Sequence, residues 1–498
     1  MQRRASWIHA GSLASTQAMQ FGVALILARL LTPHELGLFA IASALTGLLH
    51  GARDLGVSAY LQRAPSLDAA QVRAALGLSC AASALLAGGL LALAPGIAAV
   101  LNEAALAAPL RVLALGLAAV PVGAVMTALA LRDGDARQLA RTTAWGNASQ
   151  AIVAIALASA GAGAQAPAWG QAVNLAVCSL VVWPLRPRAL WGWPRLRGWA
   201  PILRIGRGTV AGGALTAAQG AAPALLLGHW AGAAQVGWLG RAQSLTALVP
   251  GLAGMALNFG ALGRWARLHH RGRALAPAVA ASAGQLAAIA WPLLAIVTAL
   301  AEPLVTTLFG PAWRQAAAAV GPLAWLAAAT IVFNGLGPAL AAVGRPGWAT
   351  LPLGVTLIAW AAFAMVLAAT FGGPDGLPRA NLNDAATVRW FAVCWLIAGL
   401  AALPCQLWLC RRWLGLRPAV LRHALLPGAI AAGMAGVAAR LGAGAVPAGA
   451  PEWLTVLAGF AAATPAWWLT VRSARGARPA RPAQPASASD RLRITIRK

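Results

Sequence analysis

Charged side chains are scarce along this sequence, and acidic ones are the scarcest. Asp, Glu, Lys and Arg make up 10% of the 498 residues, whereas a soluble domain carries roughly 25%. Acidic residues number 11 against 38 Lys and Arg, which gives a formal net charge of +27. So few charges cannot cover a water-facing surface, and an ordinary soluble protein is therefore excluded.

Residue patterns that would indicate an enzyme or a metal site are also lacking. The sequence has a single Lys, Lys498, so it contains no phosphate-binding Walker A loop, and no HExxH pattern occurs. The cysteines form no CxxC pair; they are Cys80, Cys178, Cys394, Cys405 and Cys410. We therefore expect no catalytic residues, no metal and no cofactor.

Long apolar runs are what the sequence has in abundance. Hydrophobic residues make up 60% of the chain, and runs of about 20 residues, long enough to cross a bilayer, recur along its length. Because lipid offers the backbone no hydrogen-bond partners, such runs must be helices. We predict an all-α integral membrane protein with about fourteen transmembrane helices. The expected spans are 10–31, 37–60, 74–100, 107–131, 143–163, 167–185, 202–227, 233–261, 275–307, 316–342, 348–371, 387–409, 423–441 and 453–471.

Arginine alternates between successive loops. The Arg-rich loops follow the even-numbered spans; they contain Arg63, Arg73, Arg132, Arg137, Arg141, Arg345 and the Arg residues within 186–207, 264–273 and 411–422. The positive-inside rule places these loops and both termini in the cytoplasm. The positive charge thus indicates topology and membrane-lipid contacts, with no nucleic-acid partner. Residues 473–498 are expected to be a disordered basic tail against anionic headgroups.

An internal repeat predicts two lobes. Residues 27–48 read LARLLTPHELGLFAIASALTGL, and 200 residues later 227–248 read LGHWAGAAQVGWLGRAQSLTAL. Six positions match, among them Gly37 with Gly237 and Thr46 with Thr246. Parallel repeats with a site between them are a recurring transporter plan. We expect six-helix lobes at 1–200 and 201–415 around a central cavity, with two additional helices at 416–472.

Charges inside the predicted spans are the candidate site residues. A charge in hydrocarbon costs at least about 2.5 kcal/mol, so it usually faces a cavity or a partner. We select Arg53, Arg241, Arg29 and Asp54 as substrate-binding candidates. Arg29 lies near a span end, where snorkelling is the alternative, and Asp54 could instead anchor a neighbouring helix. Arg outnumbers carboxylate in the spans, so the cavity should attract an anion such as a diphosphate.

Four segments, in order and spacing, resemble the polysaccharide-transport flippases. They are residues 27–63, the run LLLGHWAGAAQVGWLGRAQSL from Leu225, LAEPLVTTLFGPAW from Leu300 and LAAVGRPG from Leu340. These are the O-antigen and exopolysaccharide flippases of the multidrug/oligosaccharidyl-lipid/polysaccharide exporter superfamily. The resemblance implies alternating access and an inner-membrane location. It also implies a lipid-linked oligosaccharide on undecaprenyl diphosphate as cargo, flipped from the cytoplasmic to the periplasmic leaflet, and contacts with polysaccharide polymerase machinery.

Three other functions stay open. A cation-coupled multidrug exporter of the same fold needs buried carboxylates, and only Asp54 and Glu302 qualify. A peptidoglycan-precursor flippase would share the fold. A membrane glycosyltransferase or ligase, which is an enzyme, would be expected to carry a large outer loop with several charged residues, and the longest outer loop predicted here, at about 372–386, carries few.

Overall fold

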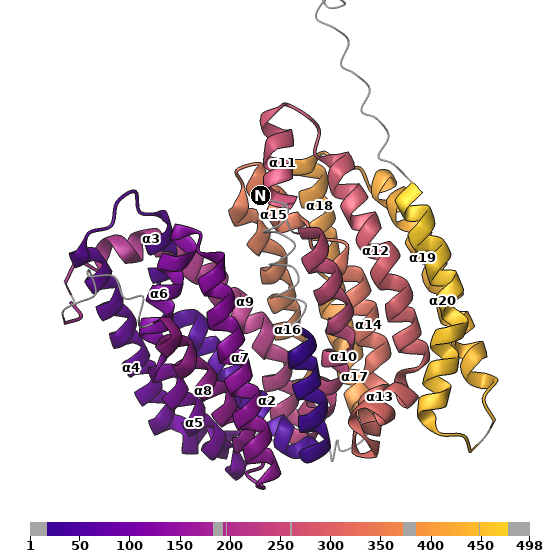
Figure 1. The fold of residues 1–498 in the computed structure, drawn as a ribbon, viewed down its shortest axis with the longest axis horizontal. Helices are drawn as coiled ribbons and strands as arrows, with labels where there is room; N and C mark the ends of the chain where they lie inside the picture. Colours follow the sequence, from indigo (N-terminus) through magenta and orange to yellow (C-terminus); the bar gives the residue numbers. More distant parts are fainter. Residues whose placement is uncertain are drawn as a thin grey trace, which may run out of the picture.

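The computed structural model describes residues 17–182, 193–195, 197–258, 261–371, 385–447 and 449–476, and all regular structure in these ranges is helical. The all-α prediction is therefore confirmed (Figure 1). A helix over Gln17–Leu30 comes first. It is followed by α2 (Pro33–Arg53), α3 (Val57–Arg63), α4 (Ala69–Val100), η1 (Ala104–Leu106), α5 (Ala107–Ala118), α6 (Val120–Asp133), α7 (Ala136–Ser159), α8 (Gln165–Val182), α9 (Ala200–Ala231), α10 (Ala233–Asn258), α11 (Ala261–His270), α12 (Ala276–Ala299), α13 (Ala301–Phe309), η4 (Pro311–Ala316), α14 (Ala317–Ile331), α15 (Leu336–Ala342), η5 (Pro346–Thr350), α16 (Leu351–Phe371), α17 (Ala385–Leu400), α18 (Leu403–Leu414), α19 (Pro418–Gly444) and α20 (Glu452–Gly476).

Length and composition make this a multi-pass membrane protein. Within the described ranges, 7 helices are long and apolar enough to cross a bilayer, and a pair bent by 49°, 104–118 with 120–133, could form one more span. Every expected span contains a helix, but the count of fourteen stays a prediction. The predicted tail needs one correction, because residues 473–476 belong to α20. The rest of that tail, like the first residues of the chain, lies outside the described ranges.

The second expected span, 37–60, is not one helix. It breaks after Arg53 into α2 and the short α3 because Leu55 and Gly56 adopt left-handed backbone angles, with φ of 42° and 81°. Gly56 also touches α9: a Cβ there would lie 2.0 Å from the Cα of Gly206. The continuous apolar pattern concealed this break, since a single Gly in a membrane helix does not by itself end it.

Two groups of helices lie side by side. Figure 1 shows α2–α8, the N-terminal group, next to α10–α20, the C-terminal group. Helix α9 lies between them, where it contacts α2 and α3 of one group and α16 of the other. The pair α19 and α20 packs on the far flank of the C-terminal group, against α12. The boundaries expected at 200 and 415 stay predictions.

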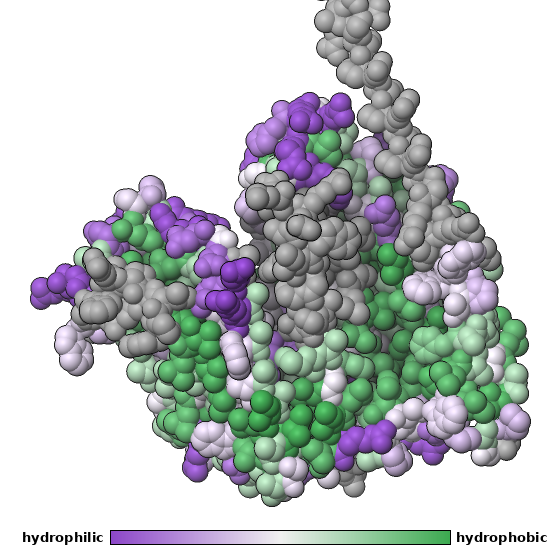
Figure 2. Space-filling model, viewed as in Figure 1, coloured by the Kyte–Doolittle hydropathy of each residue, from purple (hydrophilic) through white to green (hydrophobic). Residues whose placement is uncertain are grey.

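The two ends of the molecule differ. Helices α3, α11, α15 and α18 lie at the same end (Figure 1), and basic residues close the last turns of α3, α11 and α18. We call this the Arg-rich end. The space-filling view is hollowed between the two helix groups at this end (Figure 2). At the opposite end, which we call the closed end, the groups are in direct contact through α2 and α10.

Candidate functional site

The closed end is built on the internal repeat. A Cβ at Gly37 of α2 would lie 1.7 Å from the carbonyl oxygen of Ala233, and a Cβ at Gly237 of α10 would lie 2.0 Å from that of Pro33. Each glycine, and the residue it touches, is the counterpart of the other at the 200-residue offset. The two helices therefore cross with a local twofold symmetry, and only glycine allows the backbones so close. We call these four residues the glycine seam.

Other matched positions of the repeat occupy equivalent environments. Thr46 and Thr246 are both buried, and their hydroxyls donate to the carbonyls of Ala42 and Ala242 at 2.5 and 3.0 Å. Each threonine thus satisfies its hydroxyl within its own helix, as polar residues inside a membrane must. The matched residues of the repeat therefore occupy equivalent positions where α2 of one helix group packs against α10 of the other.

A carboxylate joins the two groups beside the seam. Glu103, which directly precedes η1, accepts a hydrogen bond from the backbone N–H of Ala233 at 3.1 Å. Its other oxygen lies 3.0 Å from Nε2 of His34 on α2. Ala233 is the first residue of α10, so a side chain of the N-terminal group caps a helix of the C-terminal group. A carboxylate at a helix N-terminus is favoured by the helix dipole.

The helix Gln17–Leu30 is held by the C-terminal group at the same end. The indole of Trp313, fully buried in η4, donates to the carbonyl of Ala28 at 2.8 Å. Arg29 donates to the carbonyls of Thr307 at 2.6 Å and Leu308 at 3.4 Å. Those carbonyls lie in the last turn of α13, where a cation is favoured. Arg29 is therefore a contact between elements in this conformation.

Arg241 reaches the same helix from α10. Its guanidinium donates to the carbonyl of Ala24 at 3.1 Å and lies 5.8 and 5.7 Å from the ring centroids of Phe309 and Trp313. The Nε atom of Arg241 is buried and has no partner among the described residues. Arg241 is thus a desolvated cation held by one carbonyl and two ring faces at the junction of the groups.

Arg53 lies elsewhere, inside the N-terminal group. It is the last residue of α2, is 3% exposed, and donates to Oγ of Ser79 on α4 at 3.2 Å. Its Nε is also buried without a partner among the described residues. Asp54, the next residue, accepts from the hydroxyl of Ser58 at 2.5 Å, next to the helix break. The adjacent charges are not paired with each other through a salt bridge.

The structure therefore brings together two of the four candidates. Arg29 and Arg241 both hold the helix Gln17–Leu30 at the closed end, whereas Arg53 and Asp54 lie at the other end of α2. Within the described ranges, the ion pairs are His34 with Glu103 and Glu302 with Arg314. Neither Arg53 nor Arg241 forms an ion pair among these residues. Their role as cargo contacts stays a prediction.

Sequence reasoning missed the residues that close the seam. Glu103 follows the long apolar helix α4 and reads as an ordinary solvated loop residue, and its partner is 130 residues away. One local signal was available. Thr32 and Glu35 form a reciprocal capping box before α2, and the spacing Thr-x-x-Glu marks such a helix start. That signal gives the helix start but not the contact between the helix groups.

Comparison with known proteins agrees with this architecture. A family model described as "polysaccharide biosynthesis protein" matches residues 26–318, more than half of the chain. The chain belongs to the polysaccharide biosynthesis protein family. No curated protein matches the sequence.

Two solved structures share the fold of this family member. The lipid II flippase MurJ in an inward closed conformation matches with a TM-score of 0.72 at 11% identity, covering 94% of this chain and 99% of that one. An inward-facing multidrug resistance MATE transporter of the MOP superfamily matches with a TM-score of 0.54 at 15% identity, covering 81% and 97%. The resemblance to the polysaccharide family is confirmed by the family match, and the two solved structures share its fold. At these identities the likeness establishes the fold alone.

Proposed function

We propose that this protein flips an oligosaccharide linked to undecaprenyl diphosphate from the cytoplasmic to the periplasmic leaflet by alternating access. Moving such a head through hydrocarbon unaided would cost on the order of tens of kcal/mol, because the diphosphate charge would lose its water. A cavity that opens to one side at a time removes most of this penalty. The polysaccharide biosynthesis family, the fold shared with a lipid II flippase, and a sequence without a recognised catalytic motif support a flippase over an enzyme.

The observation that carries the proposal is the contrast between the two ends. The glycine seam and the Glu103 cap join the helix groups at the closed end, and the Trp313 hydrogen bond ties the helix Gln17–Leu30 to the C-terminal group there. The surface is hollowed between the groups at the Arg-rich end (Figure 2). With the Arg-rich end in the cytoplasm, this is a state that receives cargo from the inner leaflet. Breaking the hydrogen bonds of Ala233 and Trp313 at the closed end would let the two helix groups rotate to a state that is open at this end and closed at the Arg-rich end.

Arg241 is suited to link cargo to this motion. In the closed state its guanidinium is desolvated and uses one carbonyl, on Ala24, although the group has five donors. A diphosphate offers bidentate, charge-assisted hydrogen bonds that a single carbonyl cannot. An anionic head that reaches Arg241 would compete with Ala24 and loosen the helix Gln17–Leu30. Arg53 is the second candidate, since its one hydrogen bond, to Ser79, also leaves donors free.

A lipid II type cargo is the second candidate function. It is favoured by the fold match to a lipid II flippase, which covers 94% of this chain. A cation-coupled drug exporter is disfavoured because Asp54 is engaged by Ser58 and Glu302 by Arg314. In both flippase cases the cargo is a polyprenyl-diphosphate glycan. We expect this protein to contact polysaccharide polymerase machinery only if the cargo is an oligosaccharide repeat unit.

Reconstitution tests the proposal directly. Purified protein in vesicles containing a polyprenyl-diphosphate oligosaccharide should make inner-leaflet sugar accessible to an impermeant oxidant or lectin, faster than in protein-free vesicles. A deletion strain should accumulate the same lipid-linked glycan on the inner leaflet, and its sugar composition separates the two cargo classes. No acceleration in vesicles, or turnover of the glycan lipid by protein in detergent, would contradict the flippase function.

The arginines are tested by substitution in the same assay. Arg53→Ala and Arg241→Ala should insert normally and lose most flipping, and Arg→Lys should recover only part, because the charge returns without the planar fork. Arg111→Ala is the matched control, since Arg111 lies on α5 and is exposed. If either Ala variant flips at the rate of the Arg111→Ala control, that arginine has a structural role only.

A further inference from the structure

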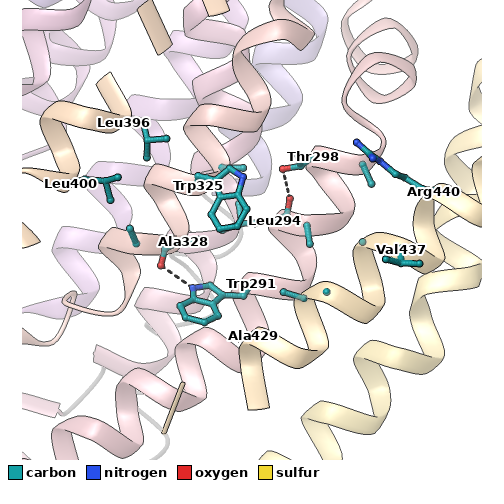
Figure 3. Close-up of a pocket in the computed structure, with 17 residues that line it drawn as sticks. Trp291, Leu294, Thr298, Trp325, Ala328, Leu396, Leu400, Ala429, Val437 and Arg440 are labelled. Carbon is teal, nitrogen blue, oxygen red and sulfur yellow. Dashed lines mark hydrogen bonds between the residues drawn. The ribbon is translucent and has the colours of Figure 1, made fainter. Parts of the chain in front are cut away.

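A separate cavity lies in the C-terminal group, away from the glycine seam. It has a volume of about 680 Å³ and is bounded by α12, α14, α17 and α19 (Figure 3). Its walls are almost entirely apolar, with Trp291, Trp325 and Leu400 on one side and Val437 on the other. Trp325 and Val437 are 69% and 61% exposed, so the cavity is open to the surrounding lipid.

The cavity is a built feature of these helices. The face of α19 that lines it carries only small side chains over two turns, at 429, 432, 433 and 436, and α12 and α14 add further alanines. The indole of Trp291 is fixed by a hydrogen bond of 2.8 Å to the carbonyl of Ala328 on α14 (Figure 3). The two helices therefore hold the wall in place without a ligand. A groove with small residues on one side and fixed aromatic rings on the other fits a flexible hydrocarbon chain.

A charged residue stands at each end of this groove. Arg440 lines the cavity near the closed end and extends from α19 towards the part of α12 that carries Thr298 (Figure 3). A second, smaller cavity of about 310 Å³ continues the groove beyond Trp291 and Ala429 to the start of α19, where Arg422 is among the lining residues. The apolar groove thus runs along α19 with one arginine at each end, near the level expected for lipid headgroups.

Arg440 is unpaired within the part of the chain that the structure describes. Among the described residues its side chain forms no ion pair and no hydrogen bond, whereas Arg314, another arginine at the closed end, is paired with Glu302 at 2.6 Å. Placing an arginine on the translocated side of a membrane is unfavourable. An exposed arginine at the rim of an apolar cavity is complementary to an anionic headgroup whose chain lies in that cavity.

We propose that this groove binds an anionic phospholipid, with an acyl chain in the cavity between α12, α14 and α19 and its phosphate on Arg440. The lipid is a resident of the membrane and is not the cargo, since the groove lies on the flank of the C-terminal group. It fills space between α14 and α19 that no side chain fills, and so stabilises the packing of α19 on this group. The inference holds whichever glycan the protein carries.

Native mass spectrometry of the full-length protein in detergent tests this site. The probes are phosphatidylglycerol and phosphatidylcholine with identical acyl chains, and the readout is the apparent affinity for the first lipid. The wild type should prefer phosphatidylglycerol. Arg440→Gln should weaken its binding about fivefold, the effect of one basic residue near a lipid surface, whereas Arg389→Gln, an exposed arginine on α17 outside the groove, should not.

Filling the groove gives an independent variant. A Cβ at Gly433 meets nothing within 4 Å, so Gly433→Leu occupies the cavity without a backbone clash and should lower the affinity for both lipids. Gly88→Leu, equally open on α4, is the control and should change neither. Equal binding of the two lipids by the wild type and Arg440→Gln, or unchanged binding by Gly433→Leu, would overturn the proposal. So would displacement of phosphatidylglycerol by an equal amount of undecaprenyl phosphate, or a dimer that Gly433→Leu dissociates.

Discussion

An alanine at Gly37 should push the two helix groups apart at the closed end. The new Cβ would lie 1.7 Å from the carbonyl oxygen of Ala233, and at least 3.0 Å is needed, so α2 and α10 must separate by 1.3 Å or more. Gly237→Ala meets the carbonyl of Pro33 at 2.0 Å and demands a similar movement. Both changes act on the state in which the closed end is shut.

The magnitude follows from the contacts that such a shift disturbs. Overpacking a tight contact costs about 1–3 kcal/mol. The N–H of Ala233 donates to Glu103 at 3.1 Å, so moving that residue also weakens a charge-assisted hydrogen bond worth about 1.5 kcal/mol or more. A total near 3 kcal/mol shifts the balance between closed and open states roughly a hundredfold. A single separation of α2 and α10 relieves both clashes. The free-energy cost of the double variant, Gly37→Ala with Gly237→Ala, should therefore be less than the sum of the costs of the two single variants.

The population of the state in which the closed end is shut can be measured by pulsed electron–electron double resonance. Spin labels at Ala105 and Ala312, both exposed at the closed end on opposite helix groups, would report the distance in a cysteine-free background. The wild type should give a single short distance. Each glycine variant should give a longer one as the main population, in both detergent and lipid vesicles, and should slow flipping because the return to the closed state is impaired.

Gly47→Ala is the matched control on the same helix. A Cβ there meets nothing within 4 Å, and alanine favours the helix more than glycine does. This variant should keep the wild-type distance. A short distance for both Gly37→Ala and Gly237→Ala, in folded protein, would show that the seam is not a gate and that the reasoning from backbone contact is wrong.

Three further predictions follow from the closed end and from the arginine alternation. Glu103→Gln should lengthen the same spin-label distance in a smaller fraction of molecules, because losing the charge at the α10 N-terminus costs only about 0.3–1 kcal/mol. Trp313→Phe should lower the free energy of unfolding by about 1–3 kcal/mol, since the carbonyl of Ala28 is left buried and unpaired. Trp145→Phe, at a tryptophan that is 64% exposed, should change little, and equal losses would refute the assignment. Reporter fusions after His270 should report the cytoplasm and those after Gly310 the periplasm; the reverse result at both would invert the topology.

Composition and periodicity alone determined the class of this protein. Sixty per cent hydrophobic residues and few charges require a membrane, and a membrane requires helices, whatever their packing. Alternating arginines determined the predicted orientation, because translocation depends on local charge. The repeat also predicted which segments matter, since Gly37 and Gly237 are legible in the sequence as a pair.

Only the tertiary structure decided what those residues do. Glycine is common here, at 54 residues, and nothing local marks Gly37 as a backbone contact with a helix 200 positions away. The break between α2 and α3 depends on Gly56 meeting Gly206. In the sequence, Arg29, Arg241 and Arg53 are all arginines within predicted spans and cannot be told apart. In the structure, Arg29 and Arg241 form contacts between elements at the closed end, whereas Arg53 lies inside the N-terminal group. Partners of a buried charge are set by chain folding over long separations, and sequence spacing along one helix carries no record of them.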